Sequence, residues 1–173
     1  MNIYLNIVFY QAIWFLCVLY GNFGALGGLV LLALHLMLSD RRAADAKMIV
    51  LFIAAGVLID TAMQEFGILA FAASSWPIPF WLVVIWAGLA TLPLHSLRWM
   101  QGRHLINIFF GGLGGPLAYW GGVKLGGAEF PHTPSLSLAV LAVVWAVFWP
   151  LAMYLAAQIS FSIHLLDRAA EKG

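Results

Sequence analysis

Three ionisable side chains within apolar stretches carry the chemistry that this sequence offers: His35, Asp60 and His95. Histidine suits proton transfer near neutral pH, and a carboxyl group in an apolar segment is costly unless it is paired or functional. We therefore predict these three as acid–base or headgroup-contacting residues. The alternatives stay open: Asp60 can join helices by pairing with Gln64, and the histidines can cap helices or meet lipid headgroups.

Five neutral polar side chains would accompany them as substrate-binding residues. Counting about 1.5 Å of rise per residue along a helix places these groups in two layers. The first layer, around Asp60, holds Gln11, Gln64 and Tyr119. The second lies near the cytoplasmic face with the two histidines and holds Asn6 and Ser96, and His164 falls at the same depth. We expect Asp60, Gln11 and Tyr119 to approach one another.

The elements that must position these residues are membrane helices. The chain is 64% hydrophobic and only 9% charged, whereas soluble domains are about 45–50% apolar and about 25% charged. A net charge of +1 offers no basic footprint for nucleic acid. The single cysteine, Cys17, excludes a disulfide within one chain, and a Cys/His zinc site has too few ligands; we predict no metal site.

Six apolar blocks predict an all-α, polytopic transmembrane bundle that occupies residues 1–173 as one integral membrane domain. A span needs about 20 apolar residues. The blocks run over about 3–20, 23–38, 48–73, 80–97, 105–125 and 135–166. Gly21-Asn22 is a turn signal between the first two, and Pro150 should kink or tilt the last.

The basic residues orient the spans, because cytoplasmic loops carry an excess of Lys and Arg. Seven of them fall on one side of the six-span layout, and only Lys124 falls on the other. The seven are Arg41, Arg42, Lys47, Arg98, Arg103, Arg168 and Lys172. Both termini are therefore predicted to be cytoplasmic.

Several motifs resemble a known family. They are Asn6, Gln11 and Trp14 with Cys17, His35 before the basic loop, Gly56 with Asp60, and the runs PFWLVVIWAGLATLPLHSLRWM and GGLGGPLAYWGGVKLG. Over nearly the whole chain they resemble a bacterial inner-membrane family catalogued as domain of unknown function 2878. The resemblance implies a multi-pass protein of the bacterial inner membrane, and no activity. It also implies that the family motif includes Gln11, His35, Asp60, His95 and Tyr119.

Three functional classes remain open. The first is a protein that binds or modifies a lipid or other amphiphile at a polar site between the helices, and it is our leading interpretation. The second is a small transporter or channel subunit, and the third a structural assembly factor without chemistry. No HExxH, GxSxG or multi-histidine motif is present. We expect no cofactor: haem held by His35 and His95 is disfavoured, because two histidines at similar depth are weak evidence for it.

Overall fold

The computed structural model describes residues 2–71 and 77–170, and their side chains up to residue 162. This part of the chain folds into five α-helices, a short 3₁₀ helix and two very short strands, so the predicted all-α class is confirmed. The elements are α1 (Ile3–Leu38), α2 (Arg42–Glu65), β1 (Ala70–Phe71), α3 (Phe80–Leu89), η1 (Arg98–Met100), α4 (His104–Lys124), β2 (Ala128–Glu129) and α5 (Pro134–Ala170).

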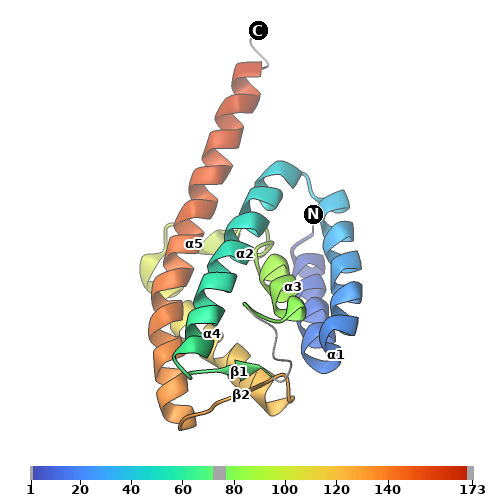
Figure 1. The fold of residues 1–173 in the computed structure, drawn as a ribbon. Coiled ribbons are helices and arrows are strands. Elements are labelled where there is room, and N and C mark those ends of the chain that lie inside the picture. Colours follow the sequence, from blue (N-terminus) through green and yellow to red (C-terminus); the bar gives the residue numbers. More distant parts are fainter. Residues whose placement is uncertain (1, 72–76, 171–173) are drawn as a thin grey trace.

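Helix α1 is folded back on itself at Gly21, so it forms a hairpin of two arms (Figure 1). Gly21 has φ 56° and ψ −136°, a conformation that glycine adopts without steric cost. A Cβ at Gly28 would lie 3.4 Å from Ile13 Cγ2 and 3.5 Å from Cys17 Sγ. In a straight helix residues 13 and 28 would be about 22 Å apart along the axis. The turn predicted at Gly21-Asn22 therefore separates two antiparallel segments.

Helix α2 begins earlier and ends earlier than the predicted span 48–73. It starts at Arg42 and stops at Glu65, and residues 72 and 73 of the predicted span lie outside the described part. Gly67, with φ 67°, ends the helix: its N–H donates to Gln64 O, and Ile68 N–H donates to Met63 O. This is a Schellman arrangement, which needs a left-handed residue that glycine supplies.

Helix α3 is about half as long as the predicted span 80–97, and that prediction is wrong in its second half. The helix ends at Leu89, and turns occupy residues 90–97. Pro93 explains the difference, because proline has no N–H and its ring clashes with the carbonyl four residues earlier. The Thr91 hydroxyl donates to Gly88 O at 2.8 Å and stabilises this early end.

Within residues 2–71 and 77–162, three helices are long and apolar enough to cross a membrane by length and composition: α1, α2 and α5. Many large apolar side chains point outward from the bundle, with examples on each long helix: Phe23 on α1, Leu58 on α2, Leu105 on α4 and Val147 on α5. A bilayer accommodates such a surface and water does not. The finer six-span layout is not established by these three helices, and it returns below as part of a proposal.

Two tryptophans and two glycines from four helices form the centre of the core. Trp86 of α3 and Trp145 of α5 stack with ring centroids 5.3 Å apart and planes 13° apart. A Cβ at Gly56 of α2 would lie 2.3 Å from the Trp86 ring, and one at Gly115 of α4 would lie 2.1 Å from the Trp145 ring. Glycine is required at both positions to admit the indoles. We call this set the glycine–tryptophan stack.

Strands β1 and β2 pair in antiparallel register, with Ala70 opposite Glu129 and Phe71 opposite Ala128. They lie at the end of the bundle where α1 bends, and the α1–α2 connection lies at the opposite end (Figure 1). The Ser137 hydroxyl donates to Ile68 O at 2.8 Å and fixes the start of α5 to the same region. The pairing connects the α2–α3 segment to the α4–α5 segment.

Candidate functional site

Three buried side chains converge near the α1–α2 connection: His35, Asp45 and His95. His95 Nε2 lies 3.0 Å from Asp45 Oδ1, and His35 Nε2 lies 3.4 Å from Asp45 Oδ2. The imidazole rings are perpendicular, with centroids 5.0 Å apart. The side chains are 1%, 0% and 6% exposed for His35, Asp45 and His95. We call these three residues the histidine–aspartate centre.

The connection between α1 and α2 positions two members of the centre. His35 lies in the last turn of α1 and Asp45 in the first turn of α2, so the short Ser39–Arg41 segment brings them face to face. The Ser39 hydroxyl donates to Asp45 Oδ2 and accepts a hydrogen bond from Arg41 N–H at 3.0 Å. These contacts within the α1–α2 connection fix the orientation of the Asp45 carboxylate independently of the two imidazoles.

The third member, His95, is held by the turns that follow α3. Asn6 of α1 fixes these turns: its Nδ2 donates to Thr91 Oγ1 at 3.0 Å, and its Oδ1 accepts from Ser96 N–H at 3.1 Å. Asn6 is fully buried. Its side-chain amide therefore anchors the backbone next to His95. The same contact joins Asn6 to Ser96, and both of these residues were predicted to bind substrate.

His35 is incompletely satisfied. Among the described residues, neither ring nitrogen of His35 has a hydrogen-bond partner, although Nε2 faces the Asp45 carboxylate at 3.4 Å. Buried polar atoms without partners are uncommon, because each costs about 1–3 kcal/mol. Two imidazoles therefore approach the Asp45 carboxylate, and of these His95 makes the hydrogen bonds while His35 lies at the longer distance of 3.4 Å.

A cleft of about 530 Å³ opens beside the centre. Its wall is half polar and half apolar, and we call it the amphipathic cleft. The lining residues are Ile3, Asp40, Arg41, Leu94, His95, Ser96, Arg98 and Trp99. A second hollow of about 710 Å³ shares Asp40, Arg41 and Arg98 with it and extends toward α5.

The second site surrounds Asp60, in the middle of the bundle. The Tyr119 hydroxyl donates to Asp60 Oδ1 at 2.5 Å, and Trp86 Nε1 donates to Asp60 Oδ2 at 2.6 Å. The carboxyl group is fully buried. It joins α2 to α3 and α4, and it sets the orientation of two aromatic rings.

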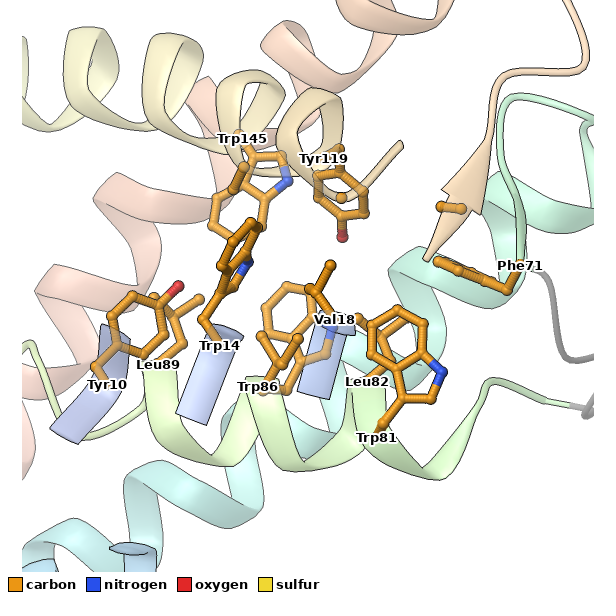
Figure 2. Close-up of a pocket in the computed structure, with 14 residues that line it drawn as sticks. Tyr10, Trp14, Val18, Phe71, Trp81, Leu82, Trp86, Leu89, Tyr119 and Trp145 are labelled. Carbon is orange, nitrogen blue, oxygen red and sulfur yellow. The ribbon is translucent and has the colours of Figure 1, made fainter. Parts of the chain in front are cut away.

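Those two rings also line an aromatic pocket. Figure 2 shows side chains from α1, β1, α3, α4 and α5 facing one another around it, among them Tyr10, Trp14, Trp81, Tyr119 and Trp145. Its cavity volume is about 60 Å³. Ligand sites for drug-sized molecules usually enclose about 300–1,000 Å³, so the pocket is too small for a lipid body in this conformation.

The structure divides the predicted polar layer around Asp60. Tyr119 reaches Asp60 as expected, whereas Gln11 does not: it is exposed and lines a separate groove between α1 and α4. The expected approach of Gln11 is therefore wrong, and Trp86 takes its place. Gln64 turns away and donates to Pro77 O at 2.7 Å.

The layer of histidines is assembled more closely than predicted. His35 and His95 are brought together with Asn6 and Ser96 nearby, while the His164 side chain lies outside the described residues. Sequence reasoning missed Asp45, because the stretch SDRRAADAK reads as a solvated loop. The sequence did offer one sign of its role: Asp45 follows His35 by ten residues, just after the turn at which the next helix begins.

These features define a class of protein: an all-helical chain whose long helices are apolar outward and polar between one another, as suits a bilayer. Comparison with known families identifies the particular one. The model of the family described as "Protein of unknown function (DUF2878)" matches residues 3–151, and the chain belongs to this family. The resemblance noted from the motifs is thereby confirmed. No curated protein and no solved structure matches the chain.

Proposed function

We propose that the protein is a multi-pass protein of the bacterial inner membrane that binds the phosphate headgroup of a phospholipid in the amphipathic cleft. The observation that carries the proposal is the cleft itself, which combines arginine side chains with an apolar wall. A phospholipid has the same division, with an anionic group joined to acyl chains. The polar part of the cleft wall therefore suits the phosphate of a phospholipid, and the apolar part suits its acyl chains.

The polar wall offers a guanidinium group to an anion. Arg98 is exposed, and no hydrogen bond or ion pair holds its guanidinium in the part of the chain that the structure describes. Arg41 is fixed by donation from Nη1 to Ser160 Oγ at 2.9 Å. Arginine binds phosphate through several N–H donors in a planar fork.

The apolar wall supplies the contact for the hydrocarbon part. Ile3, Leu94 and Trp99 line it, and Ile3 and Trp99 are both more than half exposed. Tryptophan is enriched where membrane and water meet. An acyl chain leaving the cleft would continue along the outward apolar side chains of α1, which a bilayer covers in any case.

The proposed topology places this cleft at the cytoplasmic face. Six helical segments would enter or cross the bilayer: the two arms of α1, and α2, α3, α4 and α5. The end of the bundle that holds the cleft carries four arginines in or beside its connections: Arg41, Arg42, Arg98 and Arg103. Because cytoplasmic loops carry an excess of basic residues, this end would face the cytoplasm. Both termini would then be cytoplasmic.

The Asp60 site has a structural role in this proposal. Both of its carboxylate oxygens accept a hydrogen bond from a neighbouring helix, and the adjoining cavity holds about 60 Å³. A coupling site for transport needs a carboxylate that exchanges partners during the cycle. The paired Asp60 therefore favours lipid binding in the cleft over a transport path through the centre.

Titration of the detergent-solubilised protein with a short-chain phosphatidylglycerol, followed by native mass spectrometry, tests the proposal. We expect Arg98→Gln to weaken binding about tenfold, the loss of roughly 1.4 kcal/mol from one charge-assisted contact. Lys47→Gln is the matched control, because Lys47 is exposed on the first turns of α2 and does not line the cleft. An alkyl glucoside of equal chain length tests the need for phosphate. Equal affinities for wild type and Arg98→Gln would refute the proposal.

A further inference from the structure

We infer that His35, Asp45 and His95 bind one divalent transition-metal ion of the Zn²⁺ type. The inference goes beyond lipid binding and does not depend on it, because none of its three ligands is an arginine of the cleft. It also departs from the sequence-based expectation of no metal site, which was formed without Asp45. The histidine–aspartate centre carries the inference through its distances, its burial and its unsatisfied imidazole.

The distances suit a shared ion. Ligand atoms that lie about 2.0–2.1 Å from a tetrahedral Zn²⁺ are roughly 3.3 Å from one another. The two imidazole–carboxylate separations are 3.0 Å and 3.4 Å. One ligand atom from each of the three residues lies within 4.8 Å of the other two. The three donor atoms are therefore close enough to one another to share one ion after small side-chain rotations.

The unsatisfied imidazole is an independent observation that points to a ligand. His35 is 1% exposed, and its Nε2 is directed at the carboxylate without a hydrogen-bond partner among the described residues. A simple ion pair with Asp45 needs one histidine, and His95 already lies at 3.0 Å. A metal ion accepts electron pairs from both imidazoles and the carboxylate at once, which gives the second histidine a partner.

The donor set defines the class of ion. Two neutral imidazoles and one carboxylate bind Zn²⁺ in catalytic sites and Fe²⁺ in facial sites, and both arrangements keep a position open. The Ser39 hydroxyl that donates to Asp45 Oδ2 corresponds to the outer contacts that orient metal-binding carboxylates. His95 belongs to the amphipathic cleft as well, so the open position adjoins the cavity in which a phosphate group would sit.

The experiment measures binding of Co²⁺ and Zn²⁺ to the full chain, purified without a polyhistidine tag and stripped with a chelator. Co²⁺ reports its own coordination through visible absorption, and Zn²⁺ is counted by elemental mass spectrometry after dialysis. We expect about one equivalent of either ion per chain. His35→Gln should weaken binding at least about 100-fold, because it removes a ligand rather than an outer contact.

His104→Gln is the matched control, since His104 is an exposed histidine at the start of α4 and lies outside the centre. Asp45→Asn is the second variant: it keeps the shape and the hydrogen bond from Ser39 but removes the charge, and it should also lose binding. Thermal unfolding of each variant without metal verifies that the fold persists. Wild-type protein that retains no stoichiometric ion, or His35→Gln that binds like wild type, would overturn the inference.

The arginine variant separates this inference from the lipid proposal. Arg98→Gln should bind Co²⁺ with the wild-type affinity, because its side chain contributes no ligand to the centre. His35→Gln should bind phosphatidylglycerol in the metal-free state as wild type does, since His35 does not line the cleft. Wild-type protein that binds phosphatidylglycerol but no metal ion would refute only the metal inference, and wild-type protein that binds the ion but not the lipid would refute only the lipid proposal.

Discussion

Replacing Gly56 with alanine tests the central packing of the fold. A Cβ at this position would lie 2.3 Å from Trp86 Cγ and 2.3 Å from Cδ2. These are ring atoms close to the root of the side chain, and the ring stacks on Trp145. The indole therefore cannot accommodate the methyl group by moving its tip. We expect it to shift as a whole and to lose its hydrogen bond to Asp60.

The magnitude follows from three contributions. Overpacking a dense core costs about 1–3 kcal/mol. Loss of a buried hydrogen bond to a carboxyl group costs about 1–3 kcal/mol. Alanine in place of glycine in a helix gains about 1 kcal/mol. The balance predicts that Gly56→Ala lowers the free energy of unfolding by roughly 3 kcal/mol, within a range of about 1–5 kcal/mol.

Reversible unfolding of the detergent-solubilised protein by a denaturing detergent, followed by tryptophan fluorescence, measures this change. Gly114→Ala is the matched control on α4, because the nearest atom to its added Cβ is Phe110 Cε1 at 3.9 Å, an ordinary contact. It should be neutral or slightly stabilising. The same substitution thus changes sign between two helical glycines according to what the methyl group meets.

A double-mutant cycle gives the refuting result. If Trp86 is the obstacle, Gly56→Ala should cost nothing in a Trp86→Ala background, since the space is then vacant. A Gly56→Ala protein as stable as wild type would show that the indole does not pack on this backbone. An equal cost in both backgrounds would show that another neighbour causes it.

Two further predictions concern buried hydrogen bonds. Tyr119→Phe removes the hydroxyl that donates to Asp60 and should lower the free energy of unfolding by about 1–3 kcal/mol in the same denaturation assay; an unchanged midpoint would mean that this bond contributes nothing. Asn6→Ala leaves the buried Ser96 N–H without its acceptor and should cost about 1–3 kcal/mol. Its control is Gln11→Ala on the same helix, which is exposed and should have no effect; equal losses in both would contradict the anchoring role of Asn6.

The sequence predicted helix ends well where the nearby residues alone determine the backbone conformation. The turn at Gly21 and the bounds of α4, predicted as 105–125 and observed as His104–Lys124, follow from glycine conformation and from the lengths of apolar blocks. The early end of α3 had a local signal too, Pro93, but an apolar run of membrane length outweighed it. The turns after α3 are stabilised by Asn6, which is some ninety residues away and invisible to any local rule.

The site was predictable in part for the same reason. Depth counting placed Asp60 with Tyr119 and His35 with His95, because depth depends on distance along each helix. It could not tell which side of a helix faces the bundle, so Gln11 was placed with Asp60 although it points outward. Asp45 escaped because its burial depends on α2 starting at Arg42, inside a stretch whose charges favour exposure.

The glycine–tryptophan stack has a consequence for how the protein is made. Trp86 obtains its stacking partner from residue 145 and its backbone support from residue 56, so the core draws on the first, middle and last thirds of the chain. Helix α5 is synthesised last, so the Trp86 ring lacks its stacking partner until the end of translation. Insertion of helices therefore precedes their packing, and a truncation before α5 should yield a chain that enters the bilayer, remains loosely associated and becomes a substrate for membrane proteases.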